Sequence, residues 1–183
     1  MTTPALETAR LLLKPLQSED AVQIQQKFPR WEIVQYLVST VPWPFPEGAA
    51  QNYVDNVALA ATKNGTGWFW SLRRKEAENE LIGVICLMDQ PDNNRGFWLV
   101  PEWQGQGLMS EACDVVNDFW FATLGKDVLR APKAVTNQRS KNISSRSGMR
   151  LVRKQMGQYV SGDLETELWE MTREMWERGK GRG

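Results

Sequence analysis

The chain has 183 residues, and its 22 lysine and arginine residues balance 22 aspartate and glutamate residues. This length suits one domain, expected over residues 1–183, and a neutral balance gives no electrostatic basis for binding nucleic acid or an anionic membrane. The absence of histidine excludes Ser-His-Asp and Cys-His catalysis, and no metal site is expected because two cysteines alone cannot bind zinc.

The same composition bears on the compartment. No apolar run approaches the roughly 20 residues of a membrane span, and the N-terminal residues do not have the pattern of a signal peptide. Cys86 and Cys113 both lie in apolar patterns, so free buried thiols in the cytosol are expected.

The first third of the chain predicts one strand and three helical segments. The strand is expected at residues 8–13, and a helix begins at residues 18–20 and ends at Pro29. Residues 31–38 predict a second helical piece. The segment 41–46 holds three prolines, which fix the backbone and remove donors, so it is expected to be extended.

A further helix is predicted from Glu47 to about residue 62, with an apolar face formed by Tyr53, Val54, Val57 and Ala61. Strands are then predicted at residues 68–73, 81–88 and 95–100, joined by a charged hairpin loop at 75–80 and a turn at 89–94.

The segment between residues 103 and 112 reads Trp-Gln-Gly-Gln-Gly-Leu-Met-Ser-Glu-Ala and lies between a strand and a helix. Its two glycines let the backbone approach a ligand, and the unpaired N–H groups of a first helical turn favour an anion such as phosphate. The segment is neither a dinucleotide fingerprint, which needs glycine at Ser110, nor a P-loop. It predicts a site for a phosphorylated cofactor, although a turn of this kind is also common in α/β proteins without a ligand.

The helix that follows, to Trp120, carries one apolar stripe with polar residues outside it. The stripe comprises Met109, Ala112, Cys113, Val116, Phe119 and Trp120, and the outer residues are Glu111, Asp114, Asn117 and Asp118.

The last third predicts a strand at 128–136, with Pro132 indicating a sheet edge or a bulge. A short helix at 137–147 is closed by Gly148, and two strands at 149–155 and 164–171 pair around a connection at 157–162. The tail at 178–183 is expected to fray. Most of the nine tryptophans should be core, whereas Trp31 and Trp43, among prolines and polar residues, are expected to border a cleft.

This order of elements resembles the GNAT acetyltransferase superfamily over nearly the whole chain. Gln104-Gly105-Gln106-Gly107-Leu108-Met109 is similar to the family's pyrophosphate loop, matching it at Gln104 and Gly107. Asn137-x-x-Ser140, ending at Gly148-Met149, is similar to the family's later Asn-led helix. The opening, residues 6–16, and the Pro-Trp-Pro-Phe-Pro segment resemble the RimJ/RimL branch, whose members acetylate N-terminal amino groups of ribosomal proteins.

The chain departs from the family pattern at three positions. Met109 stands where the loop usually has glycine or alanine. Ser144 stands where many members have a tyrosine that protonates the departing thiolate, so that role would pass to Ser140. Asn94 stands where a glutamate is often the general base.

The resemblance implies a mixed α+β fold, with a mostly antiparallel sheet flanked by helices and the family's fourth and fifth strands splayed around acetyl-CoA. It also implies the contacts with this co-substrate. The cofactor-binding residues would be Leu99, Val100, Gln104, Gly105, Gln106, Gly107, Leu108, Met109, Ser110, Asn137 and Ser140, with Arg139, Lys141 and Arg146 as candidates for the nucleotide phosphates. Helix capping alone would also explain Asn137 and Ser140.

The acceptor cannot be identified from the sequence. We expect Trp31, Trp43 and Phe45 to border its cleft. A protein N-terminal amino group is the first expectation and a small amine or aminoglycoside the second, while a CoA-binding module without turnover is the rival. The protein is expected to be a monomer or a homodimer. The general base is left open among Glu32, Glu47, Asp89, Asp92 and water.

Overall fold

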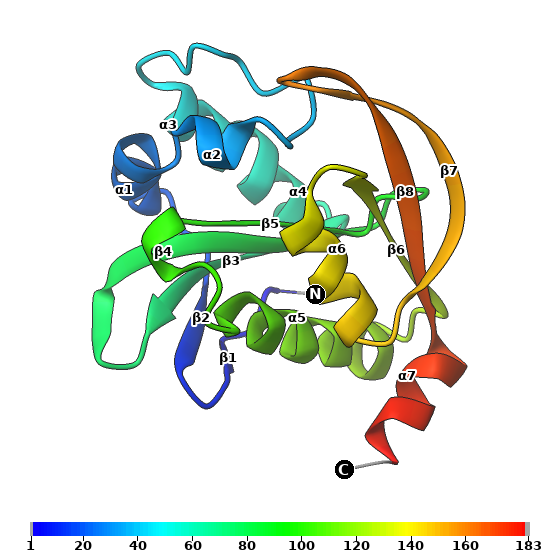
Figure 1. Ribbon diagram of the computed structural model, residues 1–183. Coiled ribbons are helices and arrows are strands. Elements are labelled where there is room, and N and C mark those ends of the chain that lie inside the picture. Colours follow the sequence, from blue (N-terminus) through cyan, green and yellow to red (C-terminus); the bar gives the residue numbers. More distant parts are fainter. Residues whose placement is uncertain (1, 182–183) are drawn as a thin grey trace.

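The computed structural model describes residues 2–181 and contains two antiparallel sheets (Figure 1). The larger sheet has the strand order β1-β2-β3-β4-β5, with β1 Leu6–Glu7, β2 Leu11–Pro15, β3 Gly67–Arg74, β4 Ala77–Met88 and β5 Arg95–Leu99. The smaller sheet has the order β6-β8-β7, with β6 Val128–Ala134, β7 Arg150–Tyr159 and β8 Gly162–Thr172. The expected mixed fold with mostly antiparallel strands is confirmed.

Helices cover both faces of the larger sheet (Figure 1). One face carries α1 Asp20–Lys27, α2 Trp31–Val34, α3 Ala49–Tyr53 and α4 Leu59–Lys63. The other face carries α5 Leu108–Asp118; α6 Gln138–Arg146 and α7 Arg173–Lys180 lie beside it. None of the helices in residues 2–181 is both long and apolar enough to cross a membrane.

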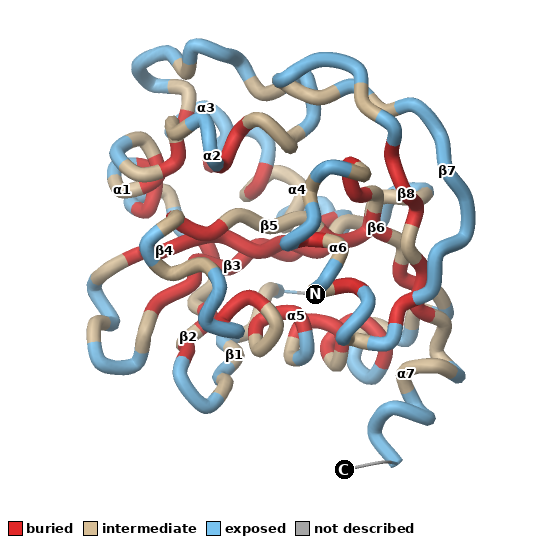
Figure 2. Tube along the Cα trace, in the orientation of Figure 1, coloured by how far each residue is buried: buried red, intermediate tan, exposed pale blue. Residues whose placement is uncertain are grey.

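The two faces of the larger sheet bury two separate apolar cores, so β3 and residues 81–87 of β4 are buried between them (Figure 2). All but the last residue of β3 are buried, which is why residues 68–73 do not show the one-sided burial that their alternation suggests. Trp70 and Trp120 are among the fully buried side chains, and each such side chain removes a large apolar area from water.

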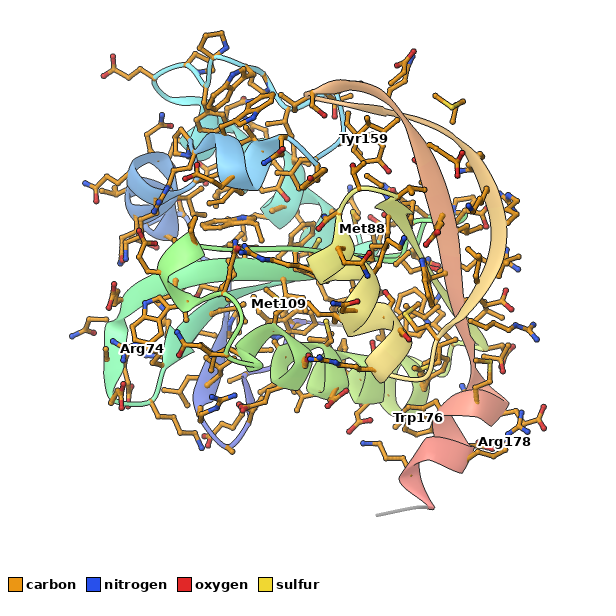
Figure 3. All side chains as sticks on the ribbon, viewed as in Figure 1. Arg74, Met88, Met109, Tyr159, Trp176 and Arg178 are labelled. Atoms are coloured by element: carbon orange, nitrogen blue, oxygen red, sulfur yellow. The ribbon has the colours of Figure 1, made fainter. Side chains whose placement is uncertain are left out.

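The apolar stripe predicted on α5 is confirmed. Met109, Ala112, Cys113, Val116, Phe119 and Trp120 are all buried. Met109 lies between α5 and the larger sheet (Figure 3). The expectation that Asn117 lies outside is wrong, because its side-chain oxygen accepts a hydrogen bond of 2.7 Å from the buried guanidinium of Arg95.

The helix predicted after Glu47 forms as α3, a π-helical turn at Val54–Ala58 and α4. Its predicted apolar face is partly wrong. Tyr53 and Val57 are exposed, while Ala50, Val54 and Ala58 are buried. The wide π-helical turn advances the backbone by less rotation per residue than an α-helix, so a face read at 3.6 residues per turn drifts around the axis.

Other boundaries also differ from the predicted ones. The strand predicted at residues 8–13 forms as β2, which begins at Leu11 after a turn that follows β1, and the helical piece from Trp31 ends at Val34. The predicted hairpin loop is mostly strand, since β4 begins at Ala77, and β7 and β8 leave a connection of only Val160 and Ser161. In the tail, residues 178–180 belong to α7, residues 182–183 lie outside the described part of the chain, and fraying stays a prediction.

Candidate functional site

The two sheets meet at Asn94, just before β5, and part beyond it. The Asn94 backbone N–H donates to the Arg130 carbonyl at 2.7 Å, and the Arg130 N–H donates to the Asn94 side-chain oxygen at 2.8 Å. The Asn94 amide group also donates to the carbonyls of Met88 and Gln90. Asn94 therefore joins the sheets where β5 and β6 begin, and it does not have the free carboxylate of a general base.

Beyond Asn94, β5 stays in one sheet and β6 in the other, so the parallel strands splay. Each leaves an edge without a neighbouring strand, and Pro132 lies on such an edge, as predicted. Unpaired strand edges of this kind can bind an extended ligand through its amide groups. We call the space between β5 and β6 the splay.

The glycine loop closes the end of β5. Gly105 and Gly107 have φ angles of 76° and 82°, in the left-handed region that favours glycine. Gly107 is the N-cap of α5, so the backbone N–H groups of the first turn, at Leu108, Met109 and Ser110, have no partner within the helix. The arrangement fits an anion at this end of the helix.

Arg10 is a cation at this loop that the sequence reading missed, although it lies in the segment quoted for the resemblance. Its Nη2 donates to the Gln106 carbonyl at 2.8 Å, and its guanidinium pairs with Glu111 in the first turn of α5. Burial raises the pKa of Glu111, but hydrogen bonds from Thr8 and Arg10 outweigh it and leave this pKa lowered. Arg10 thus offsets the Glu111 carboxylate, which would otherwise repel a phosphate here.

Helix α6 begins at the same open end, because β6 runs parallel to β5. The Asn137 side-chain oxygen accepts from the Ser140 N–H at 3.3 Å, so Asn137 caps the helix. Capping was the alternative to cofactor binding for this residue. Ser140 and Ser144 are the buried residues of α6 and face the sheets. Both positions remain candidates for contact with a ligand in the splay.

The side chain of Gln104 links the end of β5 to helix α6. Its side-chain nitrogen donates to the Leu99 carbonyl at 2.8 Å, and its oxygen accepts from Arg139 of α6. The end of β5 and the first turn of α6 are therefore linked through one side chain. That Leu99, Val100, Gln104, Gly105, Gln106, Gly107, Leu108, Met109, Ser110, Asn137 and Ser140 bind a cofactor stays a prediction.

Trp31, Trp43 and Phe45, which were expected to border the acceptor cleft, lie on the face of the larger sheet opposite to α5. Trp31 and Trp43 are 44% and 41% exposed, and their rings are 5.8 Å apart. Phe45 packs on Phe28, which packs on Trp98 of β5. Trp31 and Trp43 are therefore exposed, whereas Phe45 is half-buried against the apolar core on this face, and the role of the three residues at a cleft stays a prediction.

The segment around α2 reaches both splayed strands. Arg30 donates to Glu102, just beyond β5, and the Tyr36 hydroxyl lies 3.5 Å from the Thr136 carbonyl, just beyond β6. The tip of the β7–β8 hairpin, near Tyr159, pairs with Val38 (Figure 3). These contacts place the aromatic segment and the hairpin tip beside the splay.

The candidate general bases are mostly paired or remote. Asp92 pairs with Arg153 and Arg130 at 2.7 and 2.8 Å, and these hydrogen bonds hold its pKa below the usual value. Asp89 pairs with Lys126 at 2.7 Å. The two glutamates, Glu32 and Glu47, are exposed. A water molecule that passes the proton to solvent remains an alternative to all four.

The splay also holds a buried lysine that the sequence reading missed. Lys133 of β6 is 6% exposed, and its Nζ lies 4.4 Å from the centroid of the Phe97 ring on β5. Burial, followed by the nearby charge of Arg95, lowers the pKa of Lys133 to about 7. The sequence could have indicated this burial only through alternation, because Lys133 follows Leu129 and Ala131 at every second position of β6.

Two surface hollows of about 300 Å³ each lie elsewhere, one beside Leu6 and Phe119 and the other beside Ala21 and Gln51. Neither is lined by the glycine loop, β6 or α6, so neither coincides with the splay. In residues 2–181, no three acidic or cysteine side chains gather as ligands for a metal ion.

Comparison with known proteins identifies the family of this chain. Residues 10–150 match the family model described as the acetyltransferase (GNAT) domain, so the chain belongs to the GNAT family and is an N-acetyltransferase. It is 28% identical over 149 residues to the uncharacterized N-acetyltransferase YoaA of Bacillus subtilis, covering 79% of this chain and 82% of that protein.

Solved structures of low identity share the fold. The ribosomal-protein-S5-alanine acetyltransferase from Vibrio fischeri is 18% identical, with a TM-score of 0.79 over 94% of this chain and 98% of that one. RimL, the ribosomal L7/L12 alpha-N-protein acetyltransferase, in complex with coenzyme A, has the same identity and TM-score over 92% and 98%. RimJ of Mycobacterium smegmatis, in complex with a CoA disulfide, is 14% identical, with a TM-score of 0.79 over 94% and 89%. The predicted resemblance to the RimJ/RimL branch is confirmed at the level of fold.

Proposed function

We propose that this protein transfers the acetyl group of acetyl-CoA to the N-terminal amino group of a protein. The observation that carries the proposal is the splay, with the glycine loop and the start of α6 at its open end. The GNAT family uses acyl-CoA, and the RimL structure that shares the fold was crystallised with CoA. The low identity to RimL leaves the acceptor as a proposal.

The backbone supplies most of the proposed contacts with acetyl-CoA. The N–H groups from Gln106 to Ser110 would bind the pyrophosphate, with Arg10 as an additional cation beside it. The outer edge of β5 near Leu99 and Val100 would pair with the amide groups of the pantetheine arm, although the Leu99 carbonyl already accepts from Gln104 and the Val100 N–H donates to the Ile82 carbonyl. Asn137 would hold the arm from the side of β6.

The remaining requirements of acetyl transfer are few. A backbone N–H of β5 would stabilise the negative charge that develops on the acetyl oxygen, and proximity of amine and thioester would supply much of the rate. The acceptor amine must also lose a proton, for which water is a sufficient route when the amine has a modest pKa. Histidine, which this chain lacks, is not needed.

A protein N-terminus suits the acceptor side because that side is open. Trp31 and Trp43 present exposed aromatic surface beside the splay, and the tip of β7–β8 packs against residues 37–39. An extended peptide end could enter between them, with its first amino group directed at the thioester. A small amine or aminoglycoside is the second candidate.

The function is tested by thiol release from acetyl-CoA in the presence of peptides with free N-termini, the same peptides with blocked N-termini, and small amines including aminoglycosides. We expect release only with free N-termini, and mass spectrometry should locate the acetyl group on the first amino group. Release with small amines alone would replace the proposed acceptor class, and CoA binding without release for any acceptor would contradict the proposed transfer.

Ser140 is expected to assist departure of the CoA sulfur. It is buried on the face of α6 that turns to the sheets, and a hydroxyl there would hydrogen-bond to the developing thiolate. Since general acid effects are about 10²–10⁴-fold and serine is a weak donor, Ser140→Ala should lower kcat about 10- to 100-fold with little change in CoA affinity.

A role limited to α6 stability would have a different signature. Because Asn137 caps α6 through the backbone N–H of residue 140, Ser140→Ala retains that bond, while Asn137→Ala removes it and should cost about 1 kcal/mol. Parallel measurement of kcat, CoA affinity and Tm for both variants separates the two roles. A kcat for Ser140→Ala within about twofold of the parent would remove Ser140 from the mechanism.

A further inference from the structure

Lys133 occupies an unusual place for a lysine. It lies on β6 opposite Glu167 of β8, and directly paired residues share a face of the sheet. That face is the one covered by α5 and α6, since Leu129 and Ala131 of the same strand belong to the core under α5. The Lys133 amine is therefore enclosed between the two sheets and two helices, against the ring of Phe97.

The carboxylate of Glu167, the cross-strand partner of Lys133, binds other groups and not the Lys133 amine. Glu167 is engaged by Lys141 of α6 at 3.3 Å and by the indole N–H of Trp169 at 3.1 Å. The other groups that act on Lys133 are Arg95 of β5, which is a second cation, and the Cys113 thiol of α5. Lys133 and Arg95 thus concentrate positive charge in the interior.

Two other buried polar groups in this region lack a partner. The Nε of Arg95 and the hydroxyl of Ser144 have none among residues 2–181. They belong to one neighbourhood, because Arg95 donates to the sulfur of Met149 at 3.4 Å and the Met149 N–H donates to the Ser144 carbonyl. Buried polar groups are nearly always satisfied, so the unpaired Arg95 and Ser144 groups near Lys133 indicate a position for a polar or anionic ligand atom.

The geometry points to Lys133 as the group that receives the departing sulfur of coenzyme A and gives it a proton. This inference rests on the proposed function. It assigns to a strand residue the task that a tyrosine at the position of Ser144 performs in many family members. Lys133 would contact the reacting sulfur itself, whereas Arg95 would act on it through its charge.

The step balances in atoms and electrons. The acceptor nitrogen supplies the electron pair of the new C–N bond, and the C–S bond breaks with its pair going to sulfur. The Lys133 ammonium gives one N–H proton to that sulfur and becomes a neutral amine. It is recharged by the proton that the acceptor nitrogen releases, through water. A pKa near neutrality suits an acid that must both give and recover a proton.

The decisive test needs no acceptor. CoA bound to the parent protein is titrated with pH while the ultraviolet absorbance of the thiolate is followed, with the protein bound to S-methyl-CoA as the blank. The protein thiols contribute little, because burial raises the pKa of Cys86 to about 11 and also raises that of Cys113. We expect the bound CoA thiol to ionise at a lower pH in the parent than in Lys133→Met, because an N–H group of Lys133 can donate to the thiolate.

Lys133→Met should raise the pKa of the bound thiol above its value in the parent, because the thiolate loses an N–H donor, with CoA affinity at neutral pH within about threefold of the parent. Lys126→Met is the matched control, since the Lys126 amine also lies over an aromatic ring, Trp120, but outside the splay. It should titrate like the parent. If Lys133→Met does not fold, Lys133→Gln is used with the same readout.

Steady-state kinetics provide a second, independent test. With an accepted amine substrate, Lys133→Met should lower kcat about 100-fold or more while KM for acetyl-CoA changes little. An equal thiol pKa in the parent and Lys133→Met would overturn the role of Lys133 and leave the proposed function standing. Failure of the parent to bind CoA would instead overturn the proposed function and this inference with it.

Discussion

Valine at position 107 is expected to reduce CoA affinity about 100-fold or more. Gly107 has a φ of 82°, where a β-branched side chain is strained by about 1–2 kcal/mol, and an added Cβ would lie 3.3 Å from Nη2 of Arg10. The strain would reorient the N–H groups at the start of α5, and the side chain would fill the space beside them. Calorimetric titration with CoA measures the effect.

Gly125→Val is the matched control for this prediction. Gly125 has a φ of 69° in a turn after α5 and no atom near a built Cβ, so it carries similar backbone strain away from the splay. It should lose stability without losing CoA affinity. CoA affinity of Gly107→Val equal to that of Gly125→Val, with the fold retained in both, would defeat the assignment of the glycine loop.

Lys133→Met is expected to stabilise the protein more at pH 6 than at pH 10. The pKa of Lys133 falls from 10.5 to about 7 on folding, so between these values the unfolded chain binds more protons than the folded one. The stability of the parent should therefore rise with pH through this window, and the cost of burying the charge is fully present below pH 7. The shift corresponds to at most about 5 kcal/mol.

Denaturant unfolding of the parent and Lys133→Met at several pH values checks this prediction. The difference between the two free energies of unfolding is the quantity of interest, because pH effects from other groups cancel in it. The stabilisation by methionine should shrink as pH rises from 7 toward 10. A difference that is independent of pH would show that Lys133 keeps an ordinary pKa in the folded protein.

The sequence by itself determined the elements around the glycine loop. Two glycines between a strand and a helix, followed by an apolar stripe at helical spacing, are local signals that predict the loop and the buried face of α5. The Asn-led helix closed by Gly148, which has a φ of 83°, is of the same kind. Each depends only on residues close together in the chain.

The sequence could not predict which polar residues become buried. Asn117 was expected on the solvent-exposed face of α5. It is buried instead, and its side-chain oxygen accepts a hydrogen bond from Arg95, 22 residues away. Arg10 joins the glycine loop from almost 100 residues away. Partners of this kind are chosen by the packing of elements, which local periodicity does not encode.

The splay itself was decided only by the tertiary structure. Nothing in residues 95–100 or 128–136 distinguishes a pair of adjacent strands from two strands that part, and the resemblance alone implied it. The strands part because Asn94 fixes them at one end while β4 and β8 hold them in separate sheets. Lys133 is buried for the same reason: its strand lies at the edge of one sheet, where the second sheet, α5 and α6 exclude water from a side chain that would otherwise be solvated.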